Sequence, residues 1–220
     1  MMAMGLLGKF GRAAIAGLLV MSINVGLAHA GTEEDFTAAM VSYERGDFAT
    51  AMPLMRKAAD AGNAEAQVVM ASMLDAAEFD EEAVAYYRKA AAAGSLEGIY
   101  RLAWMLAAGE GVKKDPKEAR LLLTKAAEGG HKAAIRGLAQ AYLRGELDVT
   151  AEQKKGPEVV KWLSLSAQDG FMPALQTLEK AYREGDYGLA VDLVKAEQYK
   201  QAIIKLTGTN TKKRRRGEAK

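Results

Sequence analysis

The sequence of 220 residues contains no cysteine. This absence excludes a disulfide framework, thiolate metal sites, cysteine nucleophiles and a lipid-modified cysteine at a processed N-terminus. The chain must therefore obtain its stability from a hydrophobic core alone. It is long enough to bury such a core within a single domain.

Histidine is almost as scarce, since the chain holds only His29 and His131. His131 directly follows Gly130, a position that favours a structural role at a helix boundary over acid–base catalysis. The sequence also lacks the HExxH, CxxC and GxSxG patterns and a phosphate-binding glycine-rich loop. We therefore expect no catalytic residues, no metal site and no cofactor, and we do not expect an enzyme.

Long apolar stretches are missing except within the first 30 residues. There, an apolar segment follows Lys9 and Arg12 and precedes the sequence Ala-His-Ala at 28–30. This order predicts a secretory signal peptide over residues 1–30, cut after Ala30. The apolar segment is shorter than the roughly 20 residues of a spanning helix, so a retained membrane anchor is the weaker alternative. We expect an exported, periplasmic protein.

An excess of one charge is also absent, because residues 31–220 carry 28 basic and 28 acidic side chains. Six of the basic residues fall in the last nine positions, which leaves residues 31–208 with 22 basic and 27 acidic side chains. A mildly acidic body thus precedes a strongly basic end. This distribution does not favour nucleic-acid binding by the whole protein.

Residues 209–220 are predicted to form a disordered tail. Its basic residues are Lys212, Lys213, Arg214, Arg215 and Arg216. The tail has three competing interpretations: a solubilising end without a partner, a tether to anionic membrane or cell-wall polymer, and a docking segment for an acidic protein. Each cation near an anionic membrane contributes ~1 kcal/mol, so a tether would be weak and salt-dependent.

One short signature recurs along the chain. It appears as KAADAG ending at Gly62, KAAAAG ending at Gly94, KAAEGG ending at Gly130 and the degenerate LSAQDG ending at Gly170. Spacings of 32 to 40 residues between these glycines are typical of helix pairs stacked as a solenoid. The predicted units are 34–62, 63–94, 95–130, 131–170 and 171–208.

Each unit contains two apolar stretches with a 3.6-residue period, which predicts a helix, a loop and a second helix. In the third unit, Asp115 is expected to cap the second helix, with Pro116 at its first position and Gly130 at its end in the left-handed conformation. Apolar side chains at equivalent places form the predicted core: Tyr43, Leu74, Leu106, Tyr142, Tyr182, Met70, Leu102, Leu138 and Leu178. The predicted fold is all-α, a right-handed α-solenoid of about five antiparallel helix pairs.

The repeated pattern resembles the Sel-one-like repeat, a relative of the tetratricopeptide repeat. The pattern is A-x-x-x-L-[GA]-x-x-[YL]-x-x-G, a loop, and K-A-x-x-W-x-x-K-A-A-x-x-G. The best matches are residues 98–130 and 134–170, and the second places Tyr142, Gly145 and Trp162 in family positions. The resemblance covers about residues 31–208. It implies the architecture and says little about the partner.

In similar solenoids the first helices of successive units line the concave face, so the resemblance implies a groove there. The mapped groove residues are Tyr100, Arg101, Trp104, Arg136, Gln140, Arg144, Gln176, Lys180 and Arg183. Arginine and lysine with aromatic anchors suit an acidic or extended peptide segment, or a chain-terminal carboxylate. The alternative is that these arginines pair with acids of the adjacent helix and keep the surface soluble.

Three functions remain open at this point. The first is a non-catalytic scaffold or regulator that binds an acidic or extended segment of an envelope protein. The second is a structural envelope protein that binds peptidoglycan or another anionic polymer through its tail. The third and least supported is a hydrolase of cell-wall or lactam substrates, since a nucleophile–base pair is missing. The sequence leaves the oligomeric state open.

Overall fold

The computed structural model describes the backbone of residues 31–217 and the side chains of residues 31–208. The predicted signal peptide lies outside the described residues. Within them, every regular element is a helix. After a first helix over residues 31–44, the elements are α2 (Phe48–Asp60), α3 (Ala64–Ala76), α4 (Asp80–Ala92), α5 (Leu96–Ala108), α6 (Pro116–Glu128), α7 (Lys132–Arg144), the short 3-10 helix η1 (Gln153–Lys155), α8 (Pro157–Gln168), α9 (Met172–Glu184) and α10 (Leu193–Gly217).

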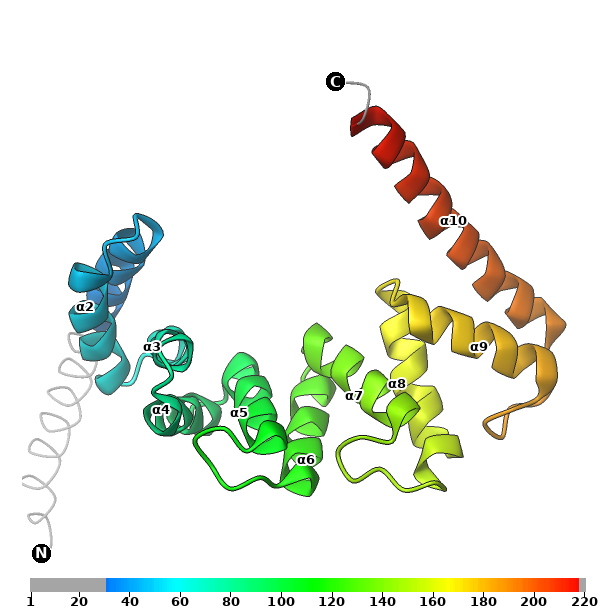
Figure 1. The fold of residues 1–220 in the computed structure, drawn as a ribbon, viewed down its shortest axis with the longest axis horizontal. Helices are drawn as coiled ribbons and strands as arrows, with labels where there is room; N and C mark the ends of the chain where they lie inside the picture. Colours follow the sequence, from blue (N-terminus) through cyan, green and yellow to red (C-terminus); the bar gives the residue numbers. More distant parts are fainter. Residues whose placement is uncertain (1–30, 218–220) are drawn as a thin grey trace, which may run out of the picture.

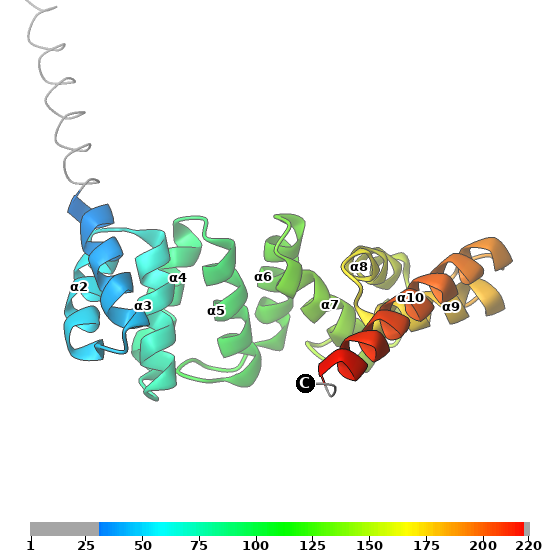
Figure 2. The same ribbon diagram turned by 90° about the horizontal axis from the view of Figure 1, so that it is seen from above.

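The helices pack mainly against their neighbours in sequence and form a curved row (Figure 1). The first helices of the middle pairs, α3, α5 and α7, lie toward the open side of the curve, and α4 and α6 lie on its outer side. The view from above shows the same row of helices (Figure 2). The structure thus confirms an all-α solenoid. No helix within residues 31–217 is both long and apolar enough to cross a bilayer.

Local sequence signals set the helix ends. The Asp115 carboxylate accepts a hydrogen bond of 2.9 Å from the Glu118 backbone N–H, and Pro116 begins α6. Gly130 has φ +90°, the left-handed conformation that lets the chain leave a helix. The predicted cap and terminator of α6 are therefore confirmed.

Small residues allow successive helices to approach closely. A Cβ atom at Gly98 of α5 would stand only 2.6 Å from the Ala90 Cβ of α4, so this crossing requires glycine. Seven predicted core residues are buried: Met70, Leu74, Leu102, Leu106, Leu138, Tyr142 and Leu178. Tyr182 is only partly buried, and Tyr43 is 37% exposed because no earlier helix pair of the described chain covers it.

The last unit differs from the expectation, because α10 passes through Gly208 and continues to Gly217. Residues 209–217, predicted to be disordered, have a helical backbone in the structure. A single internal glycine costs a helix only about 1 kcal/mol, whereas lysine and arginine are good helix formers and are favoured near a helix C-terminus. The Leu206 side chain lies beside Gly170, just before α9 begins, so the end of α10 extends beyond α9 (Figure 1).

Candidate functional site

One face of α5 is turned toward the open side of the curve. Glu97, Tyr100, Arg101 and Trp104 follow one another at the spacing that places side chains on one face of a helix. Arg101 is exposed, and the other three are partly buried. Three of the groove residues predicted in the sequence therefore lie together on this helix.

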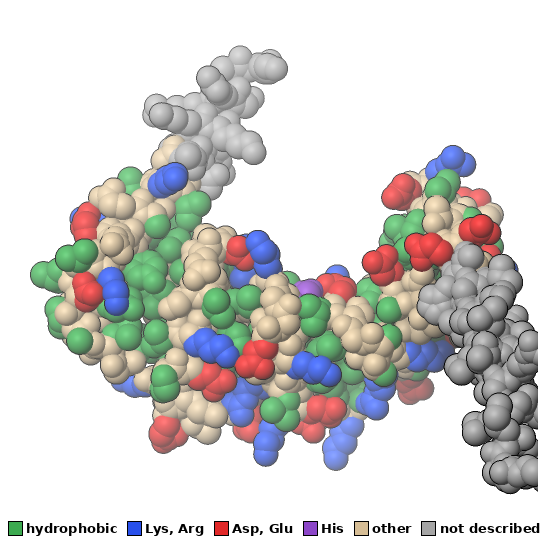
Figure 3. Space-filling model, turned by 180° about the vertical axis from the view of Figure 1, so that it is seen from behind, with side chains coloured by type: hydrophobic (Ala, Val, Ile, Leu, Met, Phe, Trp, Pro, Cys, Tyr) green, Lys and Arg blue, Asp and Glu red, His purple; other side chains and the backbone are tan. Residues whose placement is uncertain are grey.

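Tyr100 and Trp104 form an aromatic cluster with His131, the residue that precedes α7. The rings of Tyr100 and Trp104 meet edge to face at 6.3 Å between centroids, and those of Tyr100 and His131 lie 4.7 Å apart. A Cβ atom at Gly137 would be 3.1 Å from Trp104 Cζ2, so the indole lies directly against α7. The histidine, purple in Figure 3, is visible on the hollowed side of the molecule.

Both ring nitrogens of His131 have partners. Nδ1 accepts a hydrogen bond of 3.2 Å from the Ala134 backbone N–H and caps α7, as the position after Gly130 predicted for a helix boundary. Because Nδ1 accepts, Nε2 carries the hydrogen and donates it to Glu97 Oε2 at 2.8 Å. His131 therefore orients Glu97 and closes one side of the aromatic cluster.

Glu97 is also the partner of Arg101, whose Nε donates to Glu97 Oε1 at 2.6 Å. Partial burial acts to raise the pKa of Glu97, but the hydrogen bonds from Arg101 and His131 outweigh it and hold the pKa below its ordinary value. Glu97 and His131 were not among the predicted groove residues. Glu97 could have been found as an acid four positions before Arg101, whereas no local signal joins it to His131.

Most of the predicted groove cations form ion pairs with acids. These acids lie in the same helix or in the loop that follows it. Arg183 pairs with Glu179, Lys180 lies 3.8 Å from Glu184, and Arg144 lies 3.5 Å from Glu146. The Gln140 amide lies against the Arg144 guanidinium. The alternative of charge pairing thus accounts for much of this surface, although the acids are not those of the adjacent helix.

Arg136 of α7 differs from these cations. Its guanidinium donates to the Asp169 backbone carbonyl at 3.3 Å, while the Asp169 carboxylate pairs with Lys132 at 2.9 Å. Within the described part of the chain, no carboxylate lies within ion-pair distance of Arg136. Arg136 is exposed on the helix against which Trp104 packs, and it can therefore pair with a carboxylate from outside.

The remaining predicted residues lie away from the aromatic cluster. Gln176, Lys180 and Arg183 lie on α9, which packs chiefly against α8 and α10. Gln176 and Lys180 are exposed. The predicted basic residues 212–216 belong to the part of α10 whose side chains are not described.

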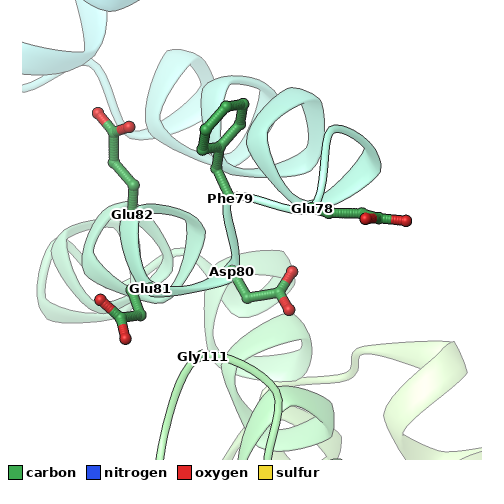
Figure 4. A pocket seen from close by; sticks show the side chains of 6 residues that line it. All are labelled: Glu78, Phe79, Asp80, Glu81, Glu82 and Gly111. Atoms are coloured by element: carbon green, nitrogen blue, oxygen red, sulfur yellow. The ribbon is translucent and has the colours of Figure 1, made fainter.

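A second hollow, of about 530 Å³, lies at the start of α4 (Figure 4). Its acidic side chains, Glu78, Asp80, Glu81 and Glu82, point in different directions. Among the described residues, no group of three or more histidine or carboxylate side chains is arranged to hold a metal ion. Asp80, Glu81 and Glu82 lie in the first turn of α4, where negative charge is favourable.

Comparison with known proteins matches this architecture. The Sel1 repeat model matches four segments that together span more than half of the chain: residues 41–63, 80–95, 96–131 and 132–171. Chitin synthase regulatory factor 2 of Schizosaccharomyces pombe is 31% identical over 106 residues. This match covers 48% of the chain but only 21% of the yeast protein.

Two solved structures have the same fold. A Sel1 repeat protein from Oxalobacter formigenes superposes with a TM-score of 0.60 at 25% identity, over 80% of this chain and 72% of that one. A protective antigen of uropathogenic Escherichia coli with an SLR fold superposes with a TM-score of 0.57 at 26% identity, over 70% of this chain and 33% of that one. The chain belongs to the Sel1 repeat family.

Proposed function

We propose that this protein is a non-catalytic scaffold of the cell envelope that binds an extended segment of a partner protein on its concave face. Sel1 repeats generally mediate protein–protein interaction. The proposal rests on the aromatic cluster of Tyr100, Trp104 and His131 and on Arg136 of α7, the helix against which Trp104 packs. Together they combine apolar contact area with a cation that has no carboxylate partner in the described chain.

This arrangement suits peptide recognition. Tyrosine and tryptophan on rigid helices offer a large contact area with little loss of side-chain entropy. An arginine without a carboxylate partner can bind a carboxylate through two parallel hydrogen bonds. An apolar residue of the partner would lie on Tyr100 and Trp104, and an acidic residue or chain-terminal carboxylate would pair with Arg136.

A catalytic role is less well supported. Sel1 repeat proteins are generally non-enzymatic scaffolds. Both nitrogens of His131 are engaged, one in capping α7 and the other with Glu97, so the histidine is not a free base. The name of the yeast relative, a regulatory factor, also favours regulation over catalysis.

Export to the periplasm is part of the proposal and rests on the leader sequence. Lys9 and Arg12, the apolar segment and the Ala-His-Ala site provide the elements of a cleaved signal peptide. The partner would then be an envelope protein.

The test is an affinity pull-down from the envelope fraction with residues 31–220. The groove variant carries alanine at Arg101, Trp104 and Arg136. The matched control carries alanine at Lys117, Leu121 and Lys125, two exposed cations and one exposed apolar residue of α6. A truncation after Gly208 examines the basic end, and thermal unfolding verifies that each variant is folded.

The proposal predicts capture of one protein by wild type, truncation and control, with loss in the groove variant. A single true anchor contributes about 2 kcal/mol or more to binding, so capture should fall below detection. Capture of cell-wall or lipid material alone, abolished by the truncation, would contradict the proposal. It would instead support the structural envelope role through the basic end.

A further inference from the structure

The repeats allow the concave face to be compared unit by unit. With the spacing that relates Leu74, Leu106 and Tyr142, the positions equivalent to Glu97 are Glu65 in the second unit and alanine in the fourth. The first unit places Glu34 there and the fifth a proline. One column of this face is therefore acidic in the first three units and uncharged in the last two.

The columns that hold Tyr100 and Trp104 change in the opposite sense. In the first two units they contain only threonine, valine and serine: Thr37, Val41, Val68 and Ser72. In the last two units they contain Arg136, Gln140, Gln176 and Lys180. In these columns the first two units are thus uncharged and the last two hold two cations, Arg136 and Lys180. The aromatic pair of α5 stands at this change.

The acidic part of this face is accessible. Glu34 and Glu65 are exposed, and no cation of the described chain lies within ion-pair distance of either. Beside Glu34, an open hollow of about 480 Å³ has mostly apolar walls, and Val41 is 42% exposed at its edge. Apolar side chains flanked by carboxylates that lack partners can receive a basic residue whose aliphatic stem packs on the apolar surface.

The charge of residues 31–208 follows the same division. Residues 31–94 carry 12 acidic and 5 basic side chains, whereas residues 95–208 carry 15 and 17. Acidic side chains, red in Figure 3, gather on the arm formed by the first helices. The excess negative charge of the described body is thus confined to the first two units. A field of this kind orients a charged ligand before contact.

We propose that the groove binds one extended segment of a partner protein with opposite charges at its two ends. Lysine or arginine lies over the first helix and α3, an apolar residue lies on the aromatic cluster, and a carboxylate pairs with Arg136. This inference rests on the proposed function and adds to it the charge pattern of the partner and its direction along the solenoid. The segment is recognised by charge complementarity at both ends and apolar contact at the centre.

The test selects peptides without assuming their sequence. A phage-displayed library of random 12-residue peptides is panned against residues 31–220, against the Glu34→Lys/Glu65→Lys variant and against the Arg136→Glu variant. A Lys117→Glu variant on α6 matches the change in net charge of Arg136→Glu. Binding of selected synthetic peptides is then measured by fluorescence anisotropy, with circular dichroism as the check on folding.

Wild type and control should enrich peptides with basic residues on one side of an apolar residue and acidic residues on the other. The double lysine variant should lose the preference for basic residues and keep the preference for acidic ones. The Arg136→Glu variant should lose the preference for acidic residues and keep the preference for basic ones. Each charge change should raise the Kd of a selected wild-type peptide about tenfold.

Three results would overturn the inference. Enrichment of uniformly acidic peptides that bind the double lysine variant as tightly as wild type would refute the charge pattern. It would leave the scaffold function intact. Enrichment of uniformly basic peptides that bind the Arg136→Glu variant as tightly as wild type would also refute the charge pattern. If no enriched peptide depends on either groove variant, both this inference and the proposed groove function fail.

Discussion

At Gly111 the turn after α5 passes against the start of α4. A Cβ atom there would lie 2.2 Å from the carbonyl carbon of Asp80, and the residue has φ +59°. Gly188 has a similar φ of +70° but no atom within 4 Å of a Cβ. Gly188→Ala should therefore cost about 1 kcal/mol from backbone strain alone. Gly111→Ala should cost at least ~2 kcal/mol more, because it also displaces the α4 backbone.

Urea denaturation of the two glycine variants measures this difference directly. The comparison is matched because both substitutions add one methyl group at a left-handed position. Equal losses in the free energy of unfolding would show that the turn does not press on α4.

The ionised Glu97 side chain stabilises the junction of α5 and α7. Its hydrogen bonds to Arg101 and His131 lower its pKa in the folded protein, despite the opposing effect of burial. A lowered pKa means that the stabilisation is present above the ordinary value of 4.5 and is lost as pH falls through the folded value. Glu97→Gln should lose stability at neutral pH and show a shallower decline below pH 4.5 than wild type.

Chemical denaturation at a series of pH values tests the Glu97 prediction. Glu118→Gln, which removes an exposed carboxylate of α6, serves as the control for the loss of one surface acid. Parallel stability curves for wild type and Glu97→Gln would rule out the proposed contribution.

The roles of some residues could be predicted from the sequence, and the contacts of others could not. Asp115 and Gly130 were predictable, because a cap and a terminator act within one turn of their own helix. The contact between Glu97 and His131 was not, since 34 positions separate them and only the stacking of two units brings them together. The same limit applies to Arg136, whose lack of a carboxylate partner depends on the positions of side chains on other helices.

At the scale of elements, α10 is held by its first part. The rings of Tyr182 and Tyr199 stack at 5.9 Å, and Leu206 lies beside Gly170. Both contacts precede Gly208. Removing residues 209–220 should therefore change the free energy of unfolding by less than about 0.5 kcal/mol. Tyr199→Ala should cost about 2 kcal/mol, because it removes a partly buried ring.

Thermal and urea unfolding of these two variants decide the point, with wild type as the reference. A large loss of stability in the truncation would mean that the end of α10 packs on the solenoid. The sequence could not predict the length of this helix, because Gly208 and the polar residues after it are equally compatible with a linker. The interior helices were predictable because their apolar period continues through each unit.

At the scale of the whole molecule, each helix depends mainly on its neighbours along the chain. Such a solenoid should lose structure locally when one unit is damaged. Trp162 of α8 is fully buried, so Trp162→Ala should cost about 3–5 kcal/mol. Hydrogen exchange should accelerate in α7, α8 and α9 and remain slow in α2, α3 and α4. Uniform acceleration across all helices would contradict local coupling.

The curvature of the row makes one face a groove, and this groove is the proposed binding site for the partner. The repeat pattern predicted the helices that line the groove, and charge pairing with the adjacent helix was the alternative for its cations. Arg144, Lys180 and Arg183 pair instead with acids of their own helix or of the following loop. The structure therefore moves the emphasis from a broadly basic groove to the aromatic cluster and Arg136.

The most direct test of the central claim is site-specific photo-crosslinking in the native envelope. A photoreactive amino acid replaces Gln140, a residue of the proposed groove on α7, or Leu121, which is 64% exposed on α6. Recognition through the concave face predicts one defined protein adduct from position 140, absent when Arg136 is changed to alanine, and none of that adduct from position 121. The same adduct from position 121 alone, or from both positions regardless of Arg136, would contradict recognition through the concave face.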